Sequence, residues 1–318
     1  MEYAIGIDIG GTNTKIGAVL KDGKVVAENR FSTTDANDYN SYMSLLVKAI
    51  KSLMELVSDG KCMGIGLGAP NANYYTGAIE MAPNLPFTSG PIIDTLRMNF
   101  NLEHMYLTND ANAAALGEKI YGGAKDMKDF IMITLGTGLG SGIVVNGKMV
   151  YGADGFAGEL GHVTVVDSGR MCNCGKRGCL EAYVSATGIK RTYFEKVCEY
   201  NGRSSISDVK WSDMDAKVIE DAARAGDKAA IETYEYTGYM LGKSLADFVM
   251  FSRPEAIFLF GGPVKAGDLI FKPAEKSMNE HLLEVFKNKV KLLPSKLPSA
   301  YAAILGASAL VWDAVENA

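Results

Sequence analysis

The chain has 318 residues and a mass of 34.1 kDa, which favours two domains over one hydrophobic core. With 47% hydrophobic, 22% charged and 9% aromatic residues, its composition argues against a disordered or fibrous protein. The 32 Lys and Arg against 37 Asp and Glu give a formal charge of -5, without any basic run, which excludes nucleic acid and anionic membranes as main partners. No apolar stretch approaches the roughly 18 residues of a membrane span, and no signal-peptide pattern precedes the first strand, so we expect a cytoplasmic protein.

Strands and helices are expected to alternate through the first 120 residues, because runs of apolar residues at strand spacing are followed by apolar residues at helical spacing. The expected elements are a buried strand over Tyr3–Ile9, a hairpin of Lys15–Leu20 and Lys24–Arg30, a helix over Tyr42–Val57, a strand over Cys62–Gly68, a loop over Ala69–Gly90, a strand over His104–Leu107 and a helix that begins at Asp110.

The second half begins with the same pattern and then becomes mainly helical. The expected elements are a strand over Asp129–Leu135, a hairpin of Ser141–Val145 and Lys148–Tyr151, helices over Thr187–Tyr200, Asp215–Arg224 and Asp227–Phe251, a strand over Ala256–Phe260 and a final helix over Ala302–Val315. This alternation predicts two α/β domains with largely parallel sheets. The repeated strand, turn and hairpin indicate a duplicated unit.

A glycine-rich turn follows the first strand of each half. The first contains Asp8, Gly10, Gly11, Thr12, Asn13 and Lys15, and the second contains Gly136, Thr137, Gly138 and Gly140. Glycines let the backbone approach a phosphate, Thr12 adds a hydroxyl donor, and Asp8 is placed to hold Mg²⁺ directly or through water. One such turn is most often only a hairpin, but two together favour a bound polyphosphate, with Gly261 and Gly262 beside the nucleotide base.

The pair Asn109–Asp110 follows a predicted strand and begins a predicted helix. Thr, Asn and Asp are common helix caps, so a purely structural role is open. The alternative is that Asp110 accepts the proton of a hydroxyl that attacks a phosphoryl group, because a helix N-terminus favours the ionised carboxylate.

Three of the five cysteines, Cys172, Cys174 and Cys179, follow closely after His162. This Cys₃His set predicts a structural Zn²⁺ site, since four protein ligands leave no position for catalysis. Buried free thiols or a redox pair are the alternatives. Glu159 and Glu181 flank these residues and are expected to accept hydrogen bonds from vicinal hydroxyls. Asn84, between two prolines, is a further candidate for a sugar hydroxyl.

Together these motifs resemble those of the ROK family of sugar kinases and related repressors, over essentially the whole chain. They are Asp8–Thr12, Pro83–Pro86, Asn109–Asp110, Leu135–Gly140, Gly158–His162, Cys172–Glu181 and Gly261–Gly262. The resemblance implies an actin-like (ribonuclease H-like) ATPase fold with two α/β domains around a central cleft that binds ATP and Mg²⁺. It places residues 1–120 and a returning C-terminal helix of about 301–318 in the smaller domain, and 121–300 in the larger one. It also implies a homodimer.

The resemblance further assigns roles to single residues. Asp110 becomes the catalytic base on a sugar 6-hydroxyl, Asn84, Asn109, Glu159, His162 and Glu181 bind the sugar together with it, and His162, Cys172, Cys174 and Cys179 hold the zinc. Two segments depart from the family pattern. Asn71-Ala72-Asn73-Tyr74 stands where a Gly and a Val-Asp pair are common, and Gly261-Gly262-Pro263-Val264 lacks a third Gly and a Ser. The preferred hexose is therefore left open.

The activity that these motifs imply is ATP-dependent phosphorylation of glucose at the 6-hydroxyl. N-acetylglucosamine, N-acetylmannosamine, fructose or allose are alternative substrates. A transcriptional repressor would need a DNA-binding helix-turn-helix ahead of Tyr3 and a basic surface, and we do not expect one. A non-catalytic sugar sensor is disfavoured because Asp8, Thr12 and Asp110 occur together.

Overall fold

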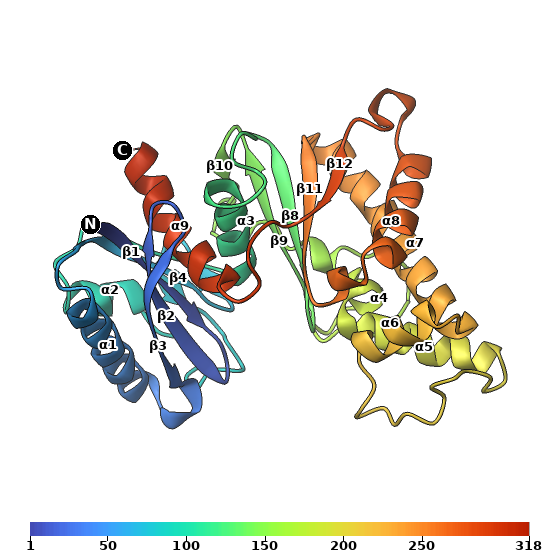
Figure 1. Cartoon of the computed structure of the whole chain (residues 1–318), viewed down its shortest axis with the longest axis horizontal. Coiled ribbons are helices and arrows are strands. Elements are labelled where there is room, and N and C mark those ends of the chain that lie inside the picture. Colours follow the sequence, from blue (N-terminus) through green and yellow to red (C-terminus); the bar gives the residue numbers. More distant parts are fainter. Residues whose placement is uncertain (318) are drawn as a thin grey trace. The chain divides into compact units, whose positions relative to one another are not determined.

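The computed structural model describes residues 1–317 and divides into two compact units (Figure 1). The first unit consists of Met1–Lys128, Gly142–Gly158 and the chain from Ser295 onward, and the second consists of Asp129–Ser141 and Glu159–Pro294. Within the described residues, no helix combines the length and the apolar character needed to cross a membrane.

The sheet of the first unit has the strand order β3-β2-β1-β4-β7. Its strands are β1 (Glu2–Ile9), β2 (Asn13–Leu20), β3 (Val25–Ser32), β4 (Lys61–Gly68) and β7 (His104–Thr108). The hairpin strands β2 and β3 pair antiparallel, whereas β4 pairs parallel with both β1 and β7. The sheet is therefore mixed: the hairpin predicted from the sequence forms its antiparallel edge, because a short connection reverses the chain, and the remaining strands β1, β4 and β7 are parallel as predicted.

Helices cover both faces of this sheet, as the alternation of side chains along β1 requires. Ile5 and Ile7 point into the main core, which contains residues of α1 (Tyr39–Leu56) and α2 (Ile92–Arg97). The opposite face packs against α9 (Ala302–Asn317), where Ala4 contacts Trp312. A Cβ on Gly66 would lie 1.9 Å from the carbonyl oxygen of Ala307, so the missing side chain allows α9 to lie directly on β4.

A further helix, α3 (Asp110–Ile120), follows β7 and packs against α9. Its buried Glu118 accepts hydrogen bonds from Gly123 N–H and Lys296 N–H at 2.6 and 3.0 Å. The Ser295 hydroxyl also donates to this carboxylate, at 2.5 Å. Glu118 therefore joins the segment after α3 to the segment before α9, both within the first unit.

The second sheet repeats the same order, β10-β9-β8-β11-β12. Its strands are β8 (Phe130–Leu135), β9 (Leu139–Val145), β10 (Lys148–Met149), β11 (Ala256–Gly261) and β12 (Lys291–Pro294). Again an antiparallel hairpin lies at one edge, and β11 pairs parallel with both β8 and β12. The two sheets thus share one plan, which confirms the duplicated unit predicted from the sequence.

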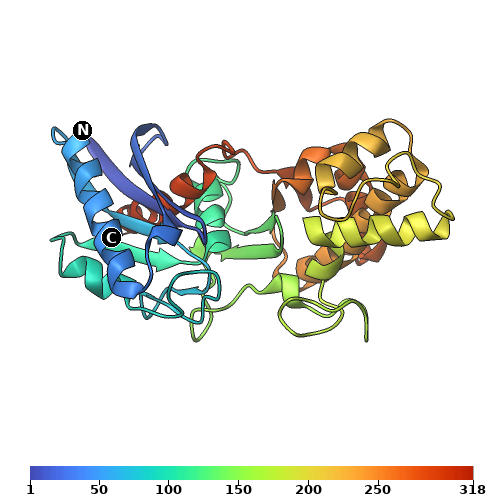
Figure 2. The same cartoon turned by 90° about the horizontal axis from the view of Figure 1, so that it is seen from below.

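The second unit contains β8, β11, β12 and the start of β9, and helices make up most of the rest of it (Figure 2). They are α4 (Glu181–Val184), α5 (Ala186–Glu199), α6 (Ala216–Arg224), α7 (Lys228–Ser252) and α8 (Asp268–His281). Ser185, Asp215 and Asp227 cap α5, α6 and α7, each by accepting a backbone N–H with its side chain. The shorter elements of the chain are β5 (Ala72–Asn73), β6 (Ala78–Ile79) and the 3₁₀ turns η1 (Thr33–Asp35), η2 (Leu160–His162), η3 (Pro263–Ala266) and η4 (Glu284–Phe286).

Candidate active site and metal centre

The first glycine-rich turn connects β1 to β2 and is closed by its own backbone. Gly10 N–H donates to the carbonyl of Asn13 at 3.1 Å, and the Thr33 hydroxyl donates to the carbonyl of Gly10 at 2.7 Å. A Cβ on Gly11 would lie 2.8 Å from the carbonyl oxygen of Asn84. Glycine at this position therefore lets the Pro83–Pro86 loop rest on the turn. Thr12, Asn13 and Lys15, which the sequence also assigns to this turn, are exposed.

Asp8 stands one residue before the end of β1, opposite Lys15 in the sheet register. Burial raises the pKa of its carboxyl to about 6; the charge of Lys15 lowers this pKa, and the charge of Asp110 raises it further. The structure therefore places two carboxyl groups that are distant in sequence close enough to repel each other. Such a pair is well suited to a cation or to a shared proton.

Asn109 and Asp110 occupy different positions at the start of α3. Asn109 is the N-cap of α3, and its Oδ1 accepts the N–H of Asn112 at 2.7 Å. Asp110 is the first residue of the helix and accepts the N–H of Ala111 at 2.9 Å. The residue is exposed as a whole, but the surrounding protein desolvates its carboxyl and thereby raises the pKa above the usual value. The backbone N–H groups of Ala111 and of Asp110 itself only partly oppose that rise. A raised pKa suits a general base.

Asn112 and Tyr151, which the sequence did not suggest as site residues, contact the residues that precede Asp110. The buried Asn112 donates from Nδ2 to the Thr108 hydroxyl at 3.2 Å, so that it holds both residues that precede Asp110. Tyr151 also hydrogen-bonds Thr108, and its ring stacks on Tyr74 with centroids 3.9 Å apart. No local pattern reveals these contacts, since a buried Asn in a helix and a Tyr in a loop are common.

The segment Asn71–Tyr74, which departs from the family pattern, also contacts the loop that begins at Tyr151. Buried Asn73 donates from Nδ2 to the carbonyl of Asp154 at 2.8 Å, and the Tyr75 hydroxyl donates to the carbonyl of Gly152 at 2.9 Å. The departing segment and the residue that follows it, Tyr75, therefore hold the backbone at Gly152 and Asp154, all within the first unit.

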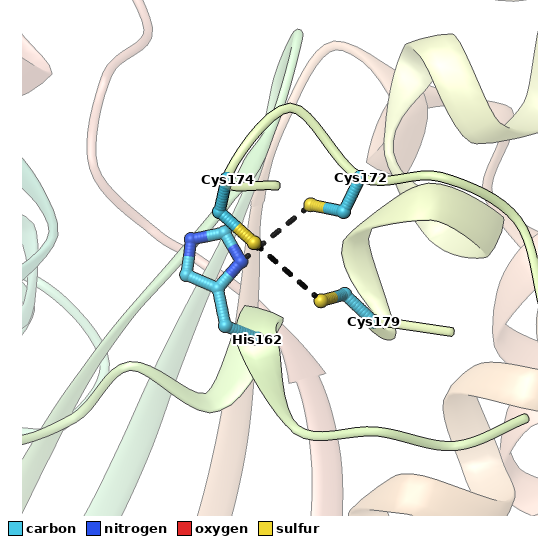
Figure 3. Close-up of side chains that lie close together, drawn as sticks. All are labelled: His162, Cys172, Cys174 and Cys179. Carbon is cyan, nitrogen blue, oxygen red and sulfur yellow. Dashed lines mark hydrogen bonds between the residues drawn. The ribbon is translucent and has the colours of Figure 1, made fainter. Parts of the chain in front are cut away.

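His162 and three cysteines of the second unit point toward one common centre (Figure 3). Their ligand atoms all lie within 4.8 Å of one another. Cys172 Sγ lies 3.7 Å from His162 Nδ1, and Cys174 Sγ lies 3.7 Å from Cys179 Sγ. A tetrahedral zinc with bonds of about 2.3 Å to sulfur needs sulfur atoms about 3.8 Å apart, so these residues fit zinc.

The two flanking glutamates differ in their surroundings. Glu159 is exposed, with Oε2 3.9 Å from His162 Nε2, the ring nitrogen that faces away from the cysteines. Glu181 is half-buried, and its Oε2 accepts the N–H of Leu139 at 2.9 Å. Glu181 therefore also contacts the second glycine-rich turn, which the sequence did not predict.

That turn and the Gly261–Gly262 segment both lie at the ends of strands of the second sheet. Gly261 has a φ of +117°, and a Cβ there would lie 1.9 Å from the carbonyl oxygen of Leu135, so β11 ends tightly against β8. Beside these strands is a pocket of about 550 Å³. It brings together Gly136, Thr137 and Gly262 with residues that the sequence did not suggest: Ala186, Asp215, Ala216, Lys217, Glu220, Tyr234, Pro263 and Lys265. Gly138 and Gly140 are not part of its lining.

The sequence-predicted site residues thus form two groups, one in each unit. The first group is Asp8, Gly10, Gly11, Thr12, Asn13, Lys15, Asn84, Asn109 and Asp110. The second group is Gly136, Thr137, Gly138, Gly140, Glu159, His162, Cys172, Cys174, Cys179, Glu181, Gly261 and Gly262.

The raised pKa of Asp8 predicts that this residue lowers stability near neutral pH. The folded protein binds the Asp8 proton more tightly than the unfolded chain, so the penalty is present above pH 6 and disappears as the pH falls below about 4. A rise of two pKa units corresponds to about 3 kcal/mol, and we expect about 1–2 kcal/mol because Asp8 is only half-buried. Urea unfolding of Asp8→Asn should show this gain at pH 8, and an equal gain at pH 4 would contradict it.

The ROK family model matches residues 4–314 of the chain. The chain belongs to the ROK family. A ROK relative, the glucokinase of Thermotoga maritima, is 34% identical over 316 residues, which cover 98% of each protein. The structure of a ROK family glucokinase from Streptomyces griseus in complex with glucose and AMPPNP is 30% identical, with a TM-score of 0.78 over 97% of this chain and 98% of that chain. The xylose repressor of Caldicellulosiruptor bescii is 29% identical over 96% of this chain and 77% of the repressor.

These similarities and the two sheets of identical strand order confirm the predicted ROK membership and the actin-like α/β fold class.

Proposed function

We propose that the protein is an ATP-dependent hexose kinase that converts glucose to glucose 6-phosphate. The observation that carries this proposal is the Asp110 carboxyl, which begins α3, has a raised pKa and lies close enough to Asp8, beside the first glycine-rich turn, for its charge to raise the pKa of Asp8. Phosphoryl transfer requires a base on the attacking hydroxyl and positive groups near the phosphates, and this unit supplies a site for each. The glucokinase relatives support glucose as the substrate.

In the proposed reaction, Asp110 accepts the proton of the 6-hydroxyl while that oxygen attacks the γ-phosphorus of ATP. The bond from the γ-phosphorus to the bridging oxygen breaks, and ADP leaves with the electron pair. Because Asn109 Oδ1 serves the helix cap, its Nδ2 is the group that donates to the hexose, and Asn84 supplies a second amide. Mg²⁺ would offset the charge of the phosphates, and we propose Asp8 as the residue that holds it directly or through water.

The second unit is proposed to complete the binding of both substrates. Glu159, His162 and Glu181 would bind hexose hydroxyls, with His162 using Nε2 because Nδ1 faces the cysteines. Backbone N–H groups of the turn over Gly136–Gly140 would bind phosphates, and the pocket beside Gly262 would take the base. Zinc would serve as a structural ion, because the Cys₃His set fills all four positions.

We further propose that the protein is a cytoplasmic homodimer. A xylose repressor and an N-acetylglucosamine repressor also occur among its relatives. A catalytic role is favoured because Asp8, Thr12 and Asp110 all belong to one unit and the two acids influence each other.

A coupled assay of ADP release tests the proposal against glucose, mannose, fructose, allose and the N-acetylated amino sugars. We expect the highest kcat/KM with glucose. A higher kcat/KM with N-acetylglucosamine, N-acetylmannosamine, fructose or allose would overturn glucose as the preferred substrate but would still support a sugar kinase. No ADP release with any hexose would favour a sugar sensor over an enzyme.

A further inference from the structure

The carboxylate of Glu181 lies between the Cys₃His cluster and the second glycine-rich turn, all within the second unit. Its Oε2 is 2.9 Å from the N–H of Leu139, and its Oε1 is 3.3 Å from Cys172 Sγ. One side chain therefore contacts a proposed zinc ligand with one oxygen and the proposed phosphate-binding turn with the other.

The turn is shaped around this carboxylate. A Cβ on Gly138 would lie 2.4 Å from Oε2 of Glu181, so glycine at this position lets the carboxylate lie directly against the turn in the conformation that it adopts here. The next N–H, that of Leu139, is satisfied by the same oxygen. If the carboxylate is absent, the N–H of the buried Leu139 loses its charged acceptor, and leaving a buried donor without an acceptor costs more than losing an exposed hydrogen bond.

At its other end, the position of Glu181 depends on the metal ligands. Glu181 begins α4 only two residues after Cys179, and Ala182 N–H donates to the carbonyl of Cys179 at 3.0 Å. A helix of four residues is not stable by itself, so the position of α4 depends on the Cys172–Cys179 loop that precedes it. Holding Cys172 and Cys179 on one ion would therefore fix the direction of the Glu181 side chain.

We propose that Glu181 is a positioning residue that couples the zinc site to nucleotide affinity, in addition to any contact with the sugar. The metal-bound Cys172–Cys179 loop orients the Glu181 carboxylate, and this carboxylate holds the Gly136–Gly140 turn in the conformation that binds the phosphates. This inference rests on the proposed function, because it takes this turn as the phosphate-binding turn. It predicts an effect on nucleotide binding when no hexose is present, which a residue that only binds sugar would not produce.

Calorimetric titration of the zinc-loaded protein with ADP and Mg²⁺, without hexose, tests the coupling. Glu181→Ala should weaken ADP binding about 10-fold or more, whereas Glu181→Gln should recover most of the affinity because its amide oxygen can still accept the Leu139 N–H. Glu275→Ala is the matched control, since Glu275 is an exposed glutamate of the same unit with no proposed role in the site, and its ADP affinity should stay within about two-fold of the wild type.

Replacement of zinc by Co²⁺ provides a second readout in the folded protein. Coupling is reciprocal, so ADP should shift the visible absorption bands of the Co²⁺-loaded wild type and should leave those of Glu181→Ala unchanged. The inference is wrong if Glu181→Ala binds ADP like the wild type, or if ADP leaves the wild-type Co²⁺ spectrum unchanged. Failure of the wild type to bind ADP at all would instead overturn the proposed function.

Discussion

Asp110→Asn should lower kcat by about 10³-fold or more while the glucose Kd changes by less than about three-fold. The amide keeps the size of the side chain and can keep the hydrogen bond from Ala111 N–H through its oxygen, but it cannot accept the proton of the 6-hydroxyl. Stopped-flow or coupled kinetics together with glucose titration separate the two quantities. Asp126→Asn, an exposed change in the same unit, is the matched control and should keep wild-type kcat.

The dependence of kcat/KM on pH also tests whether Asp110 is the catalytic base. Because the pKa of Asp110 is raised and the ionised form is the base, kcat/KM should fall as the pH drops through a pKa above the ordinary value for Asp. Residual kcat above about one tenth of the wild type in Asp110→Asn would contradict the assigned role of this residue.

Loss of the metal centre should reduce hexose affinity and thermal stability together. Cys174→Ser removes an exposed ligand, so little packing is lost directly, yet His162 and the Cys172–Cys179 loop beside Glu181 are no longer held together by an ion. We expect the glucose Kd to rise at least about 10-fold and Tm to fall by about 10 °C, as for the loss of a tightly bound structural ion. Cys198→Ser, an exposed cysteine outside the cluster, is the matched control and should change neither quantity.

Zinc content by elemental analysis belongs with these measurements. Purified wild type should hold one zinc per chain, and Cys174→Ser should hold far less. A chelated, metal-free wild type that binds glucose with unchanged affinity would show that the metal does not organise the sugar-binding residues.

The elements that the sequence predicted correctly are those with strong local periodicity. The buried strand at the N-terminus, the long helix α7 and the final helix α9 all lie within a few residues of their expected bounds. The missed elements have weak local signals. Helix α8 contains Pro273, which usually ends a helix, but here the ring packs against Gly238 of α7. Helix α2 has six residues, too few for a helical pattern to appear.

The features of the candidate site also fall into those that the sequence predicts and those that it does not. The chemistry of Asp110 and of the Cys₃His set was apparent because the residue types themselves limit what such groups can do. The repulsion between Asp8 and Asp110, the stack of Tyr74 on Tyr151 and the contact of Glu181 with the Leu139 N–H depend on long-range packing, and no local spacing encodes them.

A crystal structure of the protein with glucose and a non-hydrolysable ATP analogue would show whether Asp110 is the catalytic base. We expect a carboxylate oxygen of Asp110 to lie within hydrogen-bonding distance, about 2.6–3.2 Å, of the glucose 6-hydroxyl. A complex in which another group contacts that hydroxyl and Asp110 points elsewhere would contradict this expectation.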